Sequence, residues 1–230
     1  MPSELRVFGI GGFGEIGAGA DIGAMIADTG EVAPGDVVVI AQKIVSKAEG
    51  HMVAARTRED ARAAARREAR RIVRETEQHL IVETRHGFVC ANAGVDMSNV
   101  PDGVVALLPK DPDRSAARIR ATLEERIGPP IAVIVSDTFG RAWRIGQSNV
   151  AIGSSGIEAL RTYEGRSDPA GHELVVTQIA QIDELAAATE LVMDKLARIP
   201  VAVVRGYAFE PSDGSTAREL VRPPEMDLFR

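Results

Sequence analysis

Short apolar runs alternate along the chain with segments whose apolar residues recur at helical spacing. Continuous β-branched runs such as VVVIA and IAVIV are typical of strands that are covered on both faces. The pattern predicts strands over residues 37–41, 80–84, 104–108, 131–135, 174–179 and 201–204. It predicts helices over residues 21–28, 58–78, 115–127 and 183–196. This alternation indicates an α/β or mixed α+β fold, with mixed sheets and flanking helices.

Composition narrows the class of protein. The chain has 230 residues, a formal net charge of −6 and only 4% aromatic residues, which argues against a nucleic-acid partner. A single cysteine excludes an internal disulfide framework and favours the reducing cytoplasm. No apolar run approaches the ~18 residues of a membrane span, and the first residues do not form a secretory signal. We therefore expect a cytoplasmic protein with one domain over residues 1–230, with room for two subdomains.

A glycine-rich motif near the N-terminus suggests a nicotinamide-dependent oxidoreductase. The residues Gly9–Gly14 satisfy G-x-G-x-x-G and follow the strand-like LRVFGI. A dinucleotide-binding fingerprint needs a helix at once and an acid that ends a second strand, whereas Asp36 precedes VVVI. Gly17 and Gly19 continue the motif, which favours a flexible loop. The oxidoreductase stays open as the alternative, and no P-loop motif is present.

Polar residues after the predicted strands form a candidate metal and phosphate site. Asp137 and Thr138 follow IAVIV after one serine, at the start of residues 137–153, whose Gly, Asn and Ser content predicts a loop. Asp96 lies in the Gly- and Asn-rich segment ANAGVDMSN. Mg²⁺ and Mn²⁺ prefer carboxylate, hydroxyl and phosphate oxygens. Arg141 and Arg144 lie nearby and carry planar cations suited to phosphate or carboxylate groups. Asp and Asn are also common turn residues, so spacing alone leaves a purely structural reading open.

Longer motifs give the chain a specific resemblance. The segments GDVVVIAQKIVSKAEG, GFVCANAGVDMSNV, VIVSDTFGRAWRIGQSNVAIG and ELVVTQIAQIDELAAATELVM occur in this order. Together they resemble the GTP-dependent coenzyme F420-0:L-glutamate ligases, either the stand-alone enzymes or the N-terminal domain of bacterial fusion proteins. The resemblance covers nearly the whole chain from Gly35 onward, and the chain has no sign of the C-terminal reductase-like domain of the fusions.

The resemblance implies an activity. GTP would phosphorylate the terminal carboxylate of coenzyme F420-0, and the amine of L-glutamate would then attack the acyl phosphate, releasing GDP and phosphate. Further glutamates can be added through γ-linkages. The resemblance also implies a homodimer with a fold peculiar to the family, two divalent ions (Mg²⁺ or Mn²⁺) and a candidate K⁺ ion. A non-catalytic deazaflavin-binding protein remains a further alternative.

Site residues follow from the resemblance, motif by motif. Asp96 and Asp137 resemble the ligands of one metal ion, and Thr138 would touch a second. Nucleotide contacts are implied at these residues: Phe13, Gly14, Glu15, Ile16, Gln42, Lys47 and Asn99. The catalytic base stays unassigned, with Arg141 and Arg144 as the candidates for the catalytic position.

The chain departs from the family pattern at three places. The N-terminal loop reads GGFGEIGAG where the family usually has a proline-containing segment. Gln42 replaces a hydroxyl residue, and Lys195 stands where some members have a glutamine that contacts metal. Because a charged lysine is a poor metal ligand, Lys195 is not expected to bind metal. These departures concern the guanine site and the nucleotide preference rather than the two aspartates.

Overall fold

A five-stranded mixed sheet forms the centre of the computed structural model, which describes residues 4–228. Its strands, in spatial order, are β1 (Arg6–Ile10), β12 (Val201–Arg205), β2 (Val37–Ala41), β8 (Ala132–Arg141) and β9 (Arg144–Ser155). β2 and β8 run parallel, whereas the other neighbouring pairs are antiparallel. The structure thus confirms the mixed α/β class.

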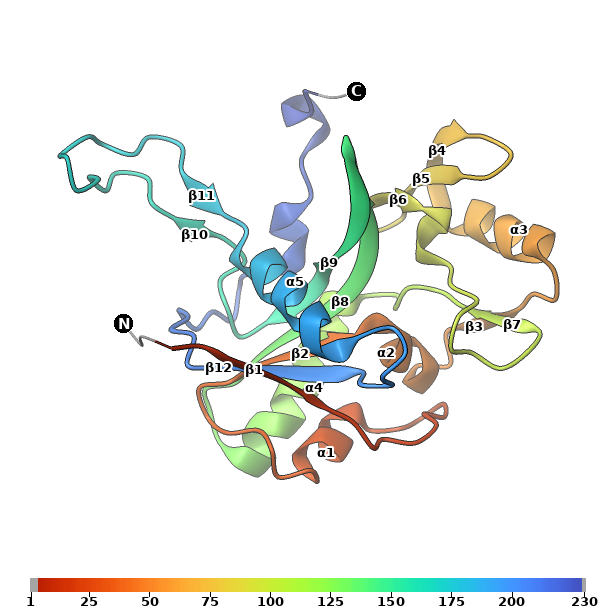
Figure 1. Cartoon of the computed structure of the whole chain (residues 1–230), viewed down its shortest axis with the longest axis horizontal. Helices are drawn as coiled ribbons and strands as arrows, with labels where there is room; N and C mark the ends of the chain where they lie inside the picture. The colour runs from red at the N-terminus through yellow and green to blue at the C-terminus, as the bar shows by residue number, and fades with distance from the viewer. Residues whose placement is uncertain (1–3, 229–230) are drawn as a thin grey trace.

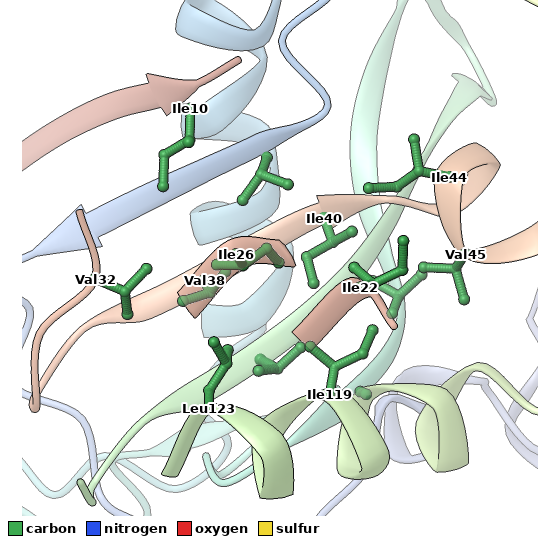
Figure 2. Close-up of a cluster of buried hydrophobic side chains, with 14 of the residues drawn as sticks. Ile10, Ile22, Ile26, Val32, Val38, Ile40, Ile44, Val45, Ile119 and Leu123 are labelled. Atoms are coloured by element: carbon green, nitrogen blue, oxygen red, sulfur yellow. The ribbon is translucent and has the colours of Figure 1, made fainter. Parts of the chain in front are cut away.

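Helices cover both faces of this sheet. The helices α1 (Ile22–Ala27) and α4 (Pro112–Ile127) lie on one face, and α5 (Gln181–Met193) lies on the other (Figure 1). Alternate residues of β2 divide between the two layers, because successive side chains of a strand point to opposite faces. Val38 and Ile40 pack with α1 and α4, as Figure 2 shows, whereas Val37 and Val39 pack with α5. This two-sided burial explains the uninterrupted VVVI run.

The helix that supports β8 and β9 has clear start and stop signals. Asp111 caps α4 by accepting a hydrogen bond from the backbone N–H of Arg114, and Pro112 occupies the first turn. The helix ends at Gly128, whose φ of 112° suits glycine. Gly153 of β9 lies so close to Pro112 that a Cβ atom there would be 2.3 Å from the proline backbone. The absence of a side chain at this position therefore lets α4 approach the sheet closely.

Smaller elements lie around the end of the central sheet toward which the parallel strands β2 and β8 run. They are α2 (Gln42–Ala48), the strand pair β3 (Met52–Ala54) and β7 (Val104–Ala106), α3 (Arg58–Glu68), the sheet β4 (Ala69–Glu75), β5 (Leu80–Thr84) and β6 (Val89–Ala91), and the short helix η1 (Asn92–Gly94). The short strands β10 (Arg161–Thr162) and β11 (Gln178–Ile179) form the base of a projecting arm (Figure 1). Two 3₁₀ helices, η2 (Ala217–Leu220) and η3 (Pro224–Met226), follow β12.

Two parts of the predicted secondary structure are wrong. Residues 58–78 form α3 followed by strand β4 instead of one helix, and residues 137–153 belong to the β8–β9 hairpin instead of a loop. The predicted strand over 174–179 shrinks to β11. The other predicted helices and strands are present, with boundaries that differ by up to three residues, except that the strand predicted over 131–135 continues to Arg141 as β8.

Tertiary pairing explains the early end of α3. Strand β5 buries Leu80, Val82 and Thr84 and supplies a hydrogen-bonding partner for the exposed β4. Helix propensity is a weak preference that such pairing overrides. The arginines accordingly meet glutamates of the folded-back chain: Arg62 and Arg66 of α3 contact Glu75 of β4, and Arg71 of β4 contacts Glu83 of β5.

The dinucleotide interpretation of Gly9–Gly14 does not fit the fold. β1 is an edge strand that pairs antiparallel with β12, and the next helix begins only at Ile22. A dinucleotide-binding unit needs a parallel strand and a helix immediately after the glycines. The structural basis for a nicotinamide-dependent oxidoreductase is therefore lacking.

The β8–β9 hairpin contains a register irregularity close to its middle. Val135 pairs with Gly153, but Ser136 pairs with Ala151, so that Ile152 is the extra residue of β9. Beyond this bulge the strands continue in regular pairing from Asp137 with Val150 to Gly140 with Gln147.

Within residues 4–228, no helix is long and apolar enough to cross a membrane.

The two-sided core makes a stability prediction. Leu123 of α4 is fully buried, whereas Leu191 of α5 is 86% exposed. We expect Leu123→Ala to lower the free energy of unfolding by about 2–5 kcal/mol, because it leaves a cavity in the core. The matched substitution Leu191→Ala should cost less than about 1 kcal/mol. Urea denaturation measures both values, and equal losses would contradict the assignment of the core.

Candidate active site

The parallel pairing of β2 with β8 brings two chain segments together at one end of the sheet. Ala41 pairs with Ser136, so Gln42 and Lys43 continue beside Asp137 and Thr138. Ligands commonly bind at the carboxyl ends of strands in open α/β sheets. The predicted location of the site after IAVIV is therefore consistent with the topology, although Asp137 and Thr138 lie within β8 and not in a loop.

Asp96 is fixed by a dense set of hydrogen bonds. It follows η1, and its backbone pairs with Ala106 through bonds of 3.1 and 3.0 Å. One carboxylate oxygen, Oδ1, accepts the backbone N–H of Ser98 at 2.6 Å, and Oδ2 accepts the Ser98 hydroxyl at 3.0 Å. The Lys43 ammonium contacts Oδ2 at 2.7 Å. Burial alone would raise the pKa of Asp96, but the bonds from Lys43 and Ser98 hold it below its usual value.

Asp137 has the opposite electrostatic environment. Burial first, and then the negative charge of Asp96, raise the pKa of its carboxyl from 3.8 to about 7. The backbone N–H of Thr138 and the ammonium groups of Lys195 and Lys43 act in the other direction. Asp96, which is remote in sequence, therefore lies within electrostatic range of Asp137, as does the Lys43 ammonium that contacts Asp96. A carboxylate pair of this kind favours a cation between or beside its members.

Thr138 connects three elements through its hydroxyl group. The hydroxyl donates to Oδ1 of Asn149, its cross-strand partner on β9, at 2.7 Å. It accepts a hydrogen bond from the Lys195 ammonium at 2.6 Å. Lys195 follows the end of α5, on the far side of the central sheet from α4. The candidate site therefore includes side chains from both helical layers and from the hairpin.

The N-terminal loop reaches the same region through Lys47. The ammonium of Lys47, on α2, contacts the Glu15 carboxylate at 3.2 Å. Ile16 is buried and Phe13 is half-buried, and both pack on the core cluster that includes α1 and α4. Gly14 has a φ of 63°, which lets the loop turn between them. The predicted nucleotide segment is thus an anchored loop that presents Glu15 at the surface.

Gln42 and Asn99 have contrasting positions. Gln42 is 2% exposed, and its side-chain oxygen accepts the Ser46 hydroxyl at 2.9 Å. Ser46 also bonds to the backbone oxygen of Leu107. Asn99 is exposed and has a φ of 53° in the loop after Asp96. Asn99 is therefore accessible to a ligand, whereas Gln42, the first residue of α2, is buried and bonded within that helix.

The two arginine candidates lie at the tip of the hairpin. Arg141 ends β8 and pairs with Arg144 at the start of β9, and its guanidinium donates to the backbone oxygen of Ile145 at 2.9 Å. Arg141 lies four residues after Asp137, which corresponds to roughly 13 Å along the strand. An arginine side chain keeps its proton in proteins, so these residues suit anion binding and not the role of a general base.

The oxygen atoms at this end of the sheet suit one hard cation. Asp96 and Asp137 supply carboxylate oxygens, which Mg²⁺ and Mn²⁺ bind together with phosphate oxygens and water. No cluster of three or more His, Cys, Asp and Glu side chains that could hold a metal ion occurs within residues 4–228. A divalent ion here would accordingly need oxygens from its substrate. A second ion on Thr138 fits poorly, because the Lys195 ammonium already binds that hydroxyl.

Comparisons with known proteins identify the family of the chain. The sequence profile of the F420-0:Gamma-glutamyl ligase family matches residues 12–206. The chain belongs to this ligase family. It is 41% identical to the Coenzyme F420:L-glutamate ligase of Methanothermobacter thermautotrophicus, over 98% of this chain and 99% of the relative. It is 42% identical to the protein of the same name from Methanopyrus kandleri, over 92% of each chain. The resemblance stated from the motifs is confirmed.

Membership of the F420-0:gamma-glutamyl ligase family leaves the roles of single residues as predictions. The structure adds three residues to those that the motifs named: Lys43, Ser98 and Asn149. The signal for Lys43 is its place two residues after β2, which continuation of the parallel register makes equivalent to the place of Thr138 in β8. Asn149 carried no signal, because the hairpin that pairs it with Thr138 was not predicted.

The opposite pKa shifts of the two aspartates generate a pH prediction for the ligand-free protein. The folded chain holds a proton on Asp137 more tightly than the unfolded chain does, so this carboxyl costs stability as pH rises from about 4 to about 7. Asp137→Asn should therefore raise the melting temperature in EDTA more at pH 8 than at pH 5.

Asp96 provides the matched comparison. Because the pKa of Asp96 is lowered in the folded chain, its carboxylate stabilises the fold at any pH above its ordinary pKa of 3.8. This contribution is therefore present both at pH 5 and at pH 8. Asp96→Asn should lower the melting temperature at pH 5 and at pH 8 alike. Equal responses of the two variants to pH, measured by differential scanning fluorimetry, would contradict the different environments of these carboxyls.

Proposed function

We propose that the chain is a GTP-dependent ligase that joins L-glutamate to the terminal carboxylate of coenzyme F420-0, in coenzyme F420 biosynthesis. Support comes first from the family membership and from the activity for which the relatives that match almost the full chain are named. The observation that carries the proposal is the convergence of Asp96 and Asp137 at the end of the β2–β8 pair. A binding protein without turnover has no need of such a costly pair of acids.

The chemistry explains why a nucleotide is needed. A carboxylate resists attack because its charge repels nucleophiles and its oxygen is a poor leaving group. Transfer of the γ-phosphoryl group of GTP would give an acyl phosphate and GDP. The glutamate amine would then attack the acyl carbon, forming the amide, breaking the bond to phosphate and releasing a proton from nitrogen. Phosphoryl transfer depends mainly on positioning and on neutralisation of charge.

The residues of the site divide between these tasks. Asp96 and Asp137 would hold a divalent cation, Mg²⁺ or Mn²⁺, which supplies charge neutralisation for phosphate oxygens. Lys47 would act as a point charge for phosphate, and Glu15 holds its ammonium in place at 3.2 Å before the nucleotide binds. Asn99 would contact the nucleotide from the loop after Asp96. Phe13, Gly14 and Ile16 would form the anchored part of the nucleotide loop, and Gln42 would support α2 from beneath.

The exposed end of the hairpin suits the acidic substrates. Arg141 and Arg144 lie beyond Asp137 on the same hairpin, and their cations match the carboxylates of glutamate and of a growing γ-linked tail. Addition of further γ-linked glutamates, a homodimer and a K⁺ ion belong to the same proposal, on the strength of the family resemblance.

The decisive experiment measures the product. After incubation with GTP, Mn²⁺, L-glutamate and coenzyme F420-0, mass spectrometry should show the coenzyme with added glutamyl units. Asp137→Asn should lower this turnover at least about a hundredfold while the protein stays folded, because the substitution removes a carboxylate charge from the cation site. Arg74→Gln on the outer strand β4 is the control and should leave turnover unchanged. Coenzyme that binds without gaining mass would indicate a non-catalytic deazaflavin-binding protein.

Ligand-induced stabilisation tests the nucleotide separately. A ligand that binds the folded state raises the melting temperature by mass action. GTP with Mg²⁺ should raise it by several degrees, and Asp137→Asn should reduce this increase. NADH should have no effect, since Gly9–Gly14 lacks the strand and helix that a dinucleotide requires. An increase with NADH and none with GTP would contradict the proposed nucleotide.

A further inference from the structure

Lys43 and Lys195, whose ammonium groups act on the two aspartates, differ in what their charges can still bind. The Lys43 ammonium donates to Oδ2 of Asp96 and to the backbone oxygen and hydroxyl of Ser98, at 2.7, 2.7 and 2.8 Å. These contacts use all three of its N–H groups. Lys43 therefore fixes Asp96 and its loop. Lys195 is exposed, and one of its N–H groups bonds to Thr138, which leaves two for a ligand.

The backbone directs Lys195 toward the site. α5 ends at the buried Met193, and Asp194 adopts a φ of 51° that turns the chain sharply. The Asp194 carboxylate accepts the backbone N–H of Leu196 at 2.6 Å, and its own N–H donates to the backbone oxygen of Glu190 at 3.2 Å. These bonds fix the residues on both sides of Lys195. Its side chain is therefore held beside Thr138 of β8.

The Thr138 hydroxyl is oriented to receive this ammonium. Its proton points to Oδ1 of the buried Asn149, so its lone pairs remain for other partners. One lone pair accepts the Lys195 N–H. A divalent ion on the other lone pair would lie about 4 Å from the ammonium nitrogen, given ordinary metal–oxygen distances. Two such positive centres repel strongly at a partly buried site.

The contacts of Thr138 therefore disagree with a second metal ion at this hydroxyl. We propose that the Lys195 ammonium takes the place of that ion, binding a phosphate oxygen of the nucleotide beside a single divalent cation held by Asp96 and Asp137. This inference rests on the proposed function. It predicts that one of the two positive charges beside the nucleotide phosphates belongs to a lysine side chain and only the other to a metal ion.

Metal stoichiometry tests the inference without relying on turnover. The free Mn²⁺ signal in electron paramagnetic resonance gives the number of ions bound per chain, with a non-hydrolysable GTP analogue present. We expect one Mn²⁺ per site in the unchanged protein and in Lys195→Arg, which keeps the charge. Lys195→Gln removes the charge and supplies an amide oxygen, and it should bind two. Arg74→Gln, which removes a cation from the outer strand β4, should bind one.

Nucleotide affinity gives a second readout. At limiting Mn²⁺, Lys195→Gln should bind the analogue about tenfold more weakly, because one charge-assisted hydrogen bond is lost. Excess Mn²⁺ should restore the affinity of this variant and leave that of the unchanged protein almost constant. Melting curves of all variants verify that the fold is retained.

The possible failures are distinguishable. Two Mn²⁺ ions in the unchanged protein, or an unaltered count in Lys195→Gln, would overturn the role of Lys195 while leaving glutamyl transfer intact. A protein that binds neither the analogue nor Mn²⁺ would overturn this inference together with the proposed function.

Discussion

The parallel pairing of β2 with β8 is the constraint on which the rest of the site depends. It is the one parallel pair in a sheet whose other neighbours are antiparallel, and it directs two chain segments out of the same edge. α2 then places Lys43 and Lys47 on one side of that edge, while β8 continues as the hairpin that carries Asp137 and Thr138. The two-sided hydrophobic core holds both strands rigidly, because their side chains pack against helices above and below.

Charge balance is the second organising principle. Two partly buried carboxylates close to each other are costly, and the chain offsets this cost with two ammonium groups from separate elements. The two carboxyl groups are not equivalent. Asp96 is hydrogen-bonded to Lys43, whereas Asp137 retains an environment that disfavours its ionised form. A bound cation would remove that penalty, so part of the free energy of Asp137 burial would be recovered on binding.

The sequence was informative where local pattern and tertiary structure agree. The continuous apolar runs VVVIA and IAVIV predicted the central strands, and the longer motifs identified the family. The pattern failed at residues 69–75, where arginines suitable for a helix form a strand because β5 pairs with it and supplies Glu83 as the partner of Arg70 and Arg71. It failed again at residues 137–153, because glycines and polar residues that are typical of a loop also suit an exposed hairpin. The contacts of Asn149 and Lys195 depend on that hairpin and on the turn after α5, so no local signal could have revealed them.

The extra residue in β9 has a consequence for how this hairpin can change length. Side chains alternate between the two faces of a strand, so a shift of one residue reverses every position beyond it. The bulge confines such a shift to one place, because Val135 pairs with Gly153 above it and Thr138 still pairs with Asn149 below it. Loss of Ile152 would make Gly153 and Ala151 consecutive partners of Val135 and Ser136, and Asn149 would stay opposite Thr138. Length variation is therefore compatible with the chemistry of the site at two places, the exposed tip around Trp143 and the bulge itself.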